Sequence, residues 1–237
     1  MIVSRKHNFI FVKTRKVAGT SVEIALSPHC GADDILSPIT PADELLRYKA
    51  GALPRNFCND PAAEDAYRAA IASGDVEKVI AARRAFEKHL VYWNHMPARA
   101  IRTAIGRTFW DRAFKFTIDR HPYEYVVSLV YFLSKSGTPL SRARKLLRTL
   151  VRVPTNRQLY SDGNEIIVDR VLRYENLAEE LRAIAPQLGV DISGALPKAK
   201  AGIRPQGASA GESLSGLERR FIRFRWRREF KLFGYEP

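Results

Sequence analysis

Cysteine is scarce in this chain: only Cys30 and Cys58 occur among its 237 residues. Two cysteines are too few for the disulfide framework that holds many small secreted proteins together. We therefore expect a compartment that keeps thiols reduced. We also expect each cysteine to be an ordinary small residue rather than a nucleophile.

Long apolar segments are missing as well. No run of about 18 apolar residues, the length needed to cross a bilayer, occurs in the sequence. The first residues, MIVSRKHNF, lack the extended apolar core of a signal peptide. These two absences predict a cytoplasmic protein with no transmembrane segment.

Acidic residues are outnumbered by basic ones, 25 to 39, which gives a formal net charge of +14. This excess makes polyanionic ligands, nucleic acid and anionic lipid candidate partners, and charge alone does not choose among them. A chain of 237 residues can bury a substantial core. We expect one domain that spans residues 1–237.

Residues 8–26 predict a strand, a basic turn and a helix in succession. Residues 8–13 are a short apolar run typical of a buried strand, and apolar residues recur at helical spacing from Val22 to Leu26. Such a junction binds anions, because free backbone N–H groups and the helix dipole point at it. Five residues of the turn could contact an anion through charge, hydroxyl groups or close backbone approach: Arg15, Lys16, Gly19, Thr20 and Ser21.

The turn differs from the phosphate-binding loop of nucleotide-hydrolysing enzymes. That loop needs a glycine, four residues and then Gly-Lys-Ser or Gly-Lys-Thr. Here Lys16 precedes the single glycine, Gly19. A plain helix cap after a core strand would explain Thr20 and Ser21, but not the neighbouring lysine and glycine.

A second junction follows about a hundred residues later. Residues 114–119, FKFTID, predict a strand, and a helix is expected from Tyr123 to Phe132. Pro122 lies near the first turn of this helix, where proline is tolerated. Arg120 at the end of the strand and Ser128 within the helix could share one phosphate group.

A third strand is expected over Ile166–Leu172, followed by the run RYENL at 173–177 and a helix to about Leu188 that Gly189 ends. Strands that alternate with helices predict a three-layer α/β fold with a mainly parallel central sheet. Ligands of such sheets bind beyond the carboxyl ends of the strands. Both basic turns are therefore expected at the ligand-binding edge.

The turn at 14–21, the segment 120–128 and the run 173–177 resemble motifs of sulfotransferases that use 3′-phosphoadenosine-5′-phosphosulfate (PAPS), in particular carbohydrate-type enzymes. The first motif of that family typically reads Pro-Lys-Thr-Ala-Gly-Thr-Ser, and Arg15 and Val17 depart from it here. The resemblance implies the P-loop-like sulfotransferase fold. It also implies transfer of a sulfuryl group from PAPS to a hydroxyl, or less often an amine, of a glycan, glycolipid or other glycoconjugate, with no metal required.

The same resemblance implies roles for individual residues. Lys16 would neutralise charge on the departing phosphate, while the residues after it would hold the 5′-phosphosulfate. Arg120 and Ser128 would bind the 3′-phosphate. A basic loop near the end of the chain would cross the nucleotide, with Lys200 or Arg204 in contact with it.

His95 is the candidate for the base that deprotonates the acceptor hydroxyl, since imidazole titrates near neutrality. It precedes a helix expected over Ala98–Ile105, and this spacing resembles a His-x-x-Ala segment of carbohydrate-type sulfotransferases. A packing or capping role is the alternative for a lone histidine. Three other residues could serve as the base instead: Glu64, Glu87 and His89.

The rest of the chain predicts supporting structure. Residues 27–91 form a variable, partly helical insertion near the acceptor side, with two helices after residue 62 and Asp75 as the cap of the second. A basic amphipathic helix is expected over 141–153, and a final helix over 214–231 whose aromatic residues pack on the core. Gln158 and Tyr160 could line the acceptor cleft.

Two other functions remain open at this stage. A phosphotransferase that uses a nucleoside triphosphate would need magnesium ligands and a Gly-Lys-Ser/Thr pattern, and neither is evident in the sequence. A nucleic-acid-binding module would use the basic, aromatic segment RRFIRFRWRREFK near the end of the chain. Binding that falls steeply with salt would favour it.

Overall fold

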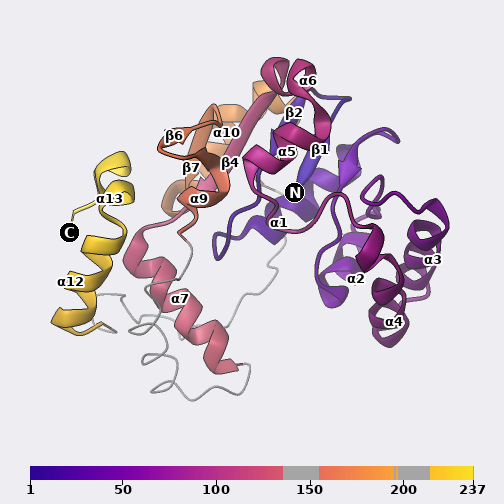
Figure 1. The fold of residues 1–237 in the computed structure, drawn as a ribbon, viewed down its shortest axis with the longest axis horizontal. Coiled ribbons are helices and arrows are strands. Elements are labelled where there is room, and N and C mark those ends of the chain that lie inside the picture. The colour runs from indigo at the N-terminus through magenta and orange to yellow at the C-terminus, as the bar shows by residue number, and fades with distance from the viewer. Residues whose placement is uncertain (136–154, 195, 197–213, 237) are drawn as a thin grey trace.

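A mixed five-stranded sheet forms the centre of the protein (Figure 1), with the strand order β3-β1-β2-β4-β7. This is a computed structural model, and it describes residues 1–135, 155–194, 196 and 214–236. The five strands of this sheet are β1 (Ile2–Ser4), β2 (Phe9–Phe11), β3 (Ile35–Leu36), β4 (Phe114–Asp119) and β7 (Arg170–Arg173).

Strand directions differ across the sheet. β4 pairs in parallel with both β2 and β7, whereas β1 pairs antiparallel with both β2 and β3. The predicted α/β class is confirmed, but the expectation of a mainly parallel sheet is wrong, because two of the four strand pairings are antiparallel. The sheet is mixed because β1 and β2 are joined by a tight connection over residues 5–8, which only antiparallel neighbours allow.

Alternating side chains of β2 and of Val12, the residue after it, pack into two separate cores on the two faces of the sheet. Phe9 and Phe11 lie in one hydrophobic cluster, and Ile10 and Val12 lie in another. The first cluster includes residues of α1 and α10, and the second includes residues of α5 and α6. Helices therefore cover both faces of the sheet.

The helices are bounded as follows: α1 (Gly19–Leu26), α2 (Pro41–Lys49), α3 (Pro61–Ala72), α4 (Val76–Phe86), α5 (Ala98–Ile105), α6 (Arg107–Arg112), α7 (Pro122–Lys135), α9 (Arg157–Tyr160), α10 (Leu177–Leu188), α12 (Gly216–Arg225) and α13 (Arg227–Phe233). Single turns of 3-10 helix occupy Ser27–His29, Glu87–His89 and Tyr174–Asn176. A small hairpin joins β5 (Ser161–Asp162) to β6 (Glu165–Ile166).

Local sequence signals set several helix ends. The side chain of Asp75 accepts hydrogen bonds from the N–H groups of Glu77 (2.9 Å) and Lys78 (3.3 Å), as predicted for the cap of α4. Gly189 ends α10 in the left-handed conformation, with φ of 66°. Ser215 and Glu218 form a capping box at the start of α12.

The segment between β3 and α5 builds its own small core beside the sheet. α2, α3 and α4 pack around buried aromatic residues, among them Phe57, Tyr67 and Phe86. Figure 1 shows these helices at one end of the protein and α12 and α13 at the other. The predicted pair of helices after residue 62 is confirmed.

Two predicted elements need correction. The strand expected over Ile166–Leu172 is split, because Glu165–Ile166 pairs with β5 and only Arg170–Arg173 joins the central sheet. The final helix is interrupted at Trp226, whose ring packs into the cluster against α7. The short strands β1 and β3 were not predicted. The helix expected over 141–153 lies outside the described residues.

Candidate functional site

The two basic turns begin side by side, because β2 and β4 are parallel neighbours in the sheet. Phe11 is in register with Phe116, and the N–H of Val12 donates to the carbonyl of Phe116 at 2.9 Å. Beyond the strands, the hydroxyl of Thr14 donates to the carbonyl of Ile118. The strand ends are thus held together up to the start of both turns.

The backbone of the first turn has an unusual conformation. Lys16 and Ala18 have positive φ angles of 62° and 57°, although neither is glycine. Ala18 is also the N-cap of α1 and provides no side-chain hydrogen bond to the helix. The first N–H groups of α1, from Gly19 to Ser21, therefore have no side-chain cap. Left-handed residues next to uncapped amides form the kind of concave backbone that binds anions.

Arg120 extends from the end of β4 across to the first turn. Its Nη1 lies 3.4 Å from the carbonyl oxygen of Lys16, and its Nη2 lies 2.9 Å from the carboxylate of Glu124. The guanidinium carbon lies 4.2 Å from the ring centroid of Tyr174. These three contacts fix the plane of the guanidinium.

Two guanidinium nitrogens of the basic turns are buried without a hydrogen-bond partner among the described residues. They are Nη1 of Arg15 and Nε of Arg120, one from each basic turn. A buried donor without a partner is costly, and it indicates either a binding role or a partner beyond those residues. An anion bound between the turns would supply such a partner.

One face of α7 connects the two turns. Glu124, Ser128 and Phe132 follow one another at intervals of four residues, so they lie on the same side of the helix. Glu124 pairs with Arg120, and the ring of Phe132 lies 4.1 Å from Nζ of Lys16. Ser128 is therefore positioned between the regions of α7 that contact Arg120 and Lys16.

Asn156 joins the turns from the other side, and sequence analysis missed it. Its side-chain amide accepts from the N–H of Arg15 at 2.9 Å and donates to the carbonyl of the same residue at 3.0 Å. The amide also donates to the carboxylate of Asp119 at 3.1 Å. No signal in the sequence indicates this contact, because Asn156 lies in a polar, turn-like segment far along the chain.

Asp119 is the buried acceptor at the end of β4. Its carboxylate receives hydrogen bonds from Asn156, from the hydroxyl of Tyr160 at 2.7 Å and from the N–H of Arg120 at 2.8 Å. Burial raises the pKa of Asp119 to about 6, and the hydrogen bonds limit the rise. Tyr160 is itself fully buried. It supports Asp119 and does not line an acceptor cleft, contrary to the prediction.

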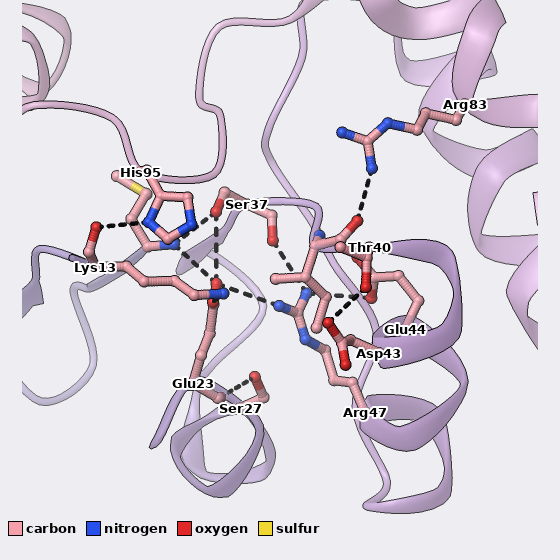
Figure 2. A network of polar contacts seen from close by, with 12 residues as sticks. Lys13, Glu23, Ser27, Ser37, Thr40, Asp43, Glu44, Arg47, Arg83 and His95 are labelled. Carbon is pink, nitrogen blue, oxygen red and sulfur yellow. Dashed lines mark hydrogen bonds and ion pairs between the residues drawn. The ribbon is translucent and has the colours of Figure 1, made fainter. Parts of the chain in front are cut away.

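A buried ionic network lies behind the first turn (Figure 2). Nζ of Lys13 lies 2.7 Å from the carboxylate of Glu23, which also lies 3.2 Å from Nη2 of Arg47. All three side chains are at most 2 % exposed. Arg47 also approaches Glu44 at 3.4 Å. The network ties β2 and α1 to α2.

Gly19 lies against this network. A Cβ atom at Gly19 would lie 3.0 Å from Cγ of Lys13 and 3.4 Å from the carbonyl oxygen of Thr14. The absent side chain therefore makes room for Lys13, a reason for glycine that the sequence pattern did not reveal. Thr20 and Ser21 lie in the first turn of α1 and are largely buried. Their contact with a ligand stays a prediction.

His95 lies next to the same turn. Its Nδ1 lies 3.1 Å from the carbonyl oxygen of Lys13, so Nδ1 carries the proton in the neutral ring and Nε2 can accept one. Burial, followed by the positive charge of Lys13, lowers the pKa of His95 to about 3. The backbone at His95 is left-handed, with φ of 60°. The residue precedes α5, as predicted.

The other candidate residues lie elsewhere. Glu64 lies in α3, and its carboxylate accepts from the N–H groups of Asn56 (2.7 Å) and Phe57 (3.0 Å). Glu87 and His89 are exposed in the turn after α4. Lys200 and Arg204 lie outside the described residues.

The run at 173–177 also joins the second turn. Glu175 accepts from the N–H of His121 at 2.8 Å and from the hydroxyl of Tyr235 at 3.0 Å. It thereby holds the turn before α7 against the end of the chain. These contacts give the run a structural role.

Comparison of the chain with models of protein families, with curated proteins and with solved structures found no match. Within the described residues, no helix is both long enough and apolar enough to span a membrane. The same part of the chain contains no group of three or more His, Cys, Asp or Glu side chains arranged to hold a metal ion.

Proposed function

We propose that this protein is a sulfotransferase that moves the sulfuryl group of PAPS to a hydroxyl of a carbohydrate or glycoconjugate. One observation carries the proposal: the two basic turns that resemble the donor motifs meet at one place. Arg120 reaches the carbonyl of Lys16, and a buried guanidinium nitrogen from each turn has no partner among the described residues.

The residues present suit a nucleotide with two anionic ends. The left-handed turn and the uncapped amides of α1 would receive the 5′-phosphosulfate, with Lys16 and Arg15 beside it. Arg120 would contact the 3′-phosphate through its remaining N–H, and Ser128 would add a hydroxyl. Bound PAPS would supply an activated sulfuryl group whose leaving group is adenosine 3′,5′-bisphosphate.

Lys16 contributes a mobile positive charge. Its Nζ lies over the ring of Phe132, and a flexible side chain can move from there toward the turn. A charge that acts where negative charge develops lowers the barrier more than it strengthens ground-state binding. Lys16 is therefore assigned to catalysis as well as to binding.

His95 is assigned as the base. The carbonyl of Lys13 fixes the ring so that Nε2 has a free lone pair for the proton of the acceptor hydroxyl. Burial is the largest cause of the low pKa of His95, and the positive charges of Lys13 and Arg15 lower this pKa further. An anion bound beside Arg15 would offset these charges and make His95 a stronger base.

The proposal is tested by measuring transfer of labelled sulfate from PAPS to a panel of hydroxyl-bearing oligosaccharides. Lys16→Ala is expected to lower kcat about 10²- to 10³-fold, the loss typical of removing one group that stabilises developing negative charge. Arg120→Ala is expected mainly to raise the KM for PAPS. Unchanged kinetics in both variants would overturn the proposal.

A further inference from the structure

A second electropositive site lies beside the proposed donor site. It is a cavity of about 280 Å³ between the segment 155–163, which contains α9, and the segment 224–229 at the junction of α12 and α13. Among the described residues, four arginines and one acidic residue line it: Arg157, Arg225, Arg227, Arg228 and Glu229. None of these residues has a role in the activity proposed above.

Neutral groups hold three of the arginines. Nη1 of Arg228 lies 2.5 Å from Oδ1 of Asn164, and Arg157 donates to the carbonyl of the same asparagine. The guanidinium of Arg227 lies 5.4 Å from the ring centroid of Phe224. These contacts orient the side chains without cancelling their charge. A planar guanidinium in a fixed position binds carboxylate, sulfate or phosphate through paired hydrogen bonds.

Glu229 gives the cavity a second kind of contact. The side chain is 4 % exposed, and its Oε1 has no hydrogen-bond partner among the described residues. A buried carboxylate oxygen is stabilised by a donor such as a hydroxyl group. The hydroxyl-bearing and amide side chains of Thr155, Gln158 and Ser161 complete the polar wall.

The cavity adjoins the place where the two basic turns meet. Thr155 lines it, and the next residue, Asn156, binds the backbone of Arg15 and the carboxylate of Asp119. Glu229 also lies close enough to Asp119 for its charge to act on that carboxyl. The cavity is therefore connected through Asn156 to the turn that is proposed to bind the donor.

We propose that this cavity binds an acidic sugar residue of the acceptor, with its anionic group on the arginines and a hydroxyl on Glu229. The inference rests on the proposed sulfotransferase function, which it deepens by naming the charge of the acceptor. A neutral sugar would leave Arg157, Arg227 and Arg228 without an anion. An inorganic anion would leave Glu229 without a donor.

The test is calorimetric titration with two tetrasaccharides of equal length, in saturating adenosine 3′,5′-bisphosphate. One alternates glucuronate with N-acetylglucosamine, and the other contains N-acetylglucosamine only. The acidic one is expected to bind at least about tenfold more tightly, as charge-assisted hydrogen bonds predict. Arg157→Ala and Arg228→Ala are expected to remove this preference, and Arg157→Lys is expected to retain part of it.

Arg220→Ala is the matched control, because Arg220 is exposed on α12 and does not line the cavity. It removes the same charge and is expected to leave the preference intact. Equal binding of the two tetrasaccharides to the unmodified protein would overturn the inference. An equal loss in Arg220→Ala and Arg228→Ala would overturn it too, since only net charge would then matter.

The two proposals fail in different ways. If adenosine 3′,5′-bisphosphate does not bind, the proposed function fails, whatever the tetrasaccharides do. If the nucleotide binds and sulfate is transferred without any preference for the acidic tetrasaccharide, only the assignment of the cavity fails.

Discussion

Lys13 precedes the first basic turn and Lys16 lies within it, three residues later, yet the two side chains occupy opposite environments. Lys13 is 2 % exposed and pairs with Glu23 at 2.7 Å, inside the network that joins β2, α1 and α2. Lys16 is half-buried on the side of α7, with its Nζ over the ring of Phe132. The comparison shows that one lysine stabilises the fold beneath the turn, while the other is positioned to act on a ligand.

Removing Glu23 from the buried ionic network is expected to lower the free energy of unfolding more than any other change proposed here. Glu23→Ala leaves Lys13 and Arg47 as buried charges without their shared carboxylate. Loss of one partner from a buried ionic network typically costs about 3–5 kcal/mol of the free energy of unfolding. Urea unfolding followed by circular dichroism measures the loss.

Lys16→Ala is the matched control in the same turn. Its free energy of unfolding is expected to stay within about 0.5 kcal/mol of the unmodified protein, as for surface substitutions in general. Equal destabilisation by Glu23→Ala and Lys16→Ala would mean that the buried network is no more important for stability than the Lys16 side chain.

A smaller loss of stability is expected from Gly19→Ala. The added Cβ would lie 3.0 Å from Cγ of Lys13, and Lys13 is held by Glu23 and cannot move aside freely. Overpacking of this kind costs about 1–3 kcal/mol. Gly216→Ala is the control, since no atom lies within 4 Å of a Cβ there. A Gly19 variant as stable as the Gly216 variant would refute the packing role of Gly19.

Asn156→Ala is expected to affect both the stability of the fold and nucleotide binding. It removes the partner of the Arg15 peptide and one hydrogen bond to Asp119, which is expected to cost about 1–3 kcal/mol of the free energy of unfolding. We also expect weaker binding of adenosine 3′,5′-bisphosphate in calorimetry, because the first turn loses its fixed position. Reduced stability with unchanged nucleotide affinity would limit Asn156 to a structural role.

The sequence was sufficient for the parts of the fold that depend on local signals. The strand at 114–119, the helix at 98–105, and the helix ends at Asp75 and Gly189 follow from apolar runs and capping residues, and the structure confirms them. The short strands β1 and β3 could not be recognised, because two or three residues carry no periodic pattern.

The candidate site was predictable only in outline. Lys16 and Arg120 could be placed at neighbouring strand ends from their motifs, and Arg120 does reach the carbonyl of Lys16. The Lys13–Glu23 pair and the Asn156 contacts could not be predicted, because each depends on which segments pack together in three dimensions. For the same reason, the sequence motif did not indicate that Gly19 packs against Lys13.

The smallest expected effect concerns His95 and pH. Its pKa is about 3 in the folded protein and 6.5 in a model peptide, so between these values the unfolded chain binds the extra proton. The His95 contribution to stability is therefore present above pH 6.5 and is lost as pH falls toward 3. From pH 6.5 to 5.5 this contribution falls by about 1 kcal/mol.

Urea unfolding of the unmodified protein and of His95→Gln at both pH values isolates this effect. The decrease in stability on acidification is expected to be smaller in the variant by about 1 kcal/mol. Identical decreases in the two proteins would show that His95 is not held in its neutral form by the fold.

The central claim is that the two basic turns form one site for a doubly anionic nucleotide. Calorimetry with adenosine 3′,5′-bisphosphate and with adenosine 5′-monophosphate tests it most directly, in the unmodified protein and in Arg120→Ala. We expect a single site that prefers the bisphosphate, and we expect Arg120→Ala to remove this preference. Equal affinity of the unmodified protein for both nucleotides, or a preference that survives Arg120→Ala, would contradict it.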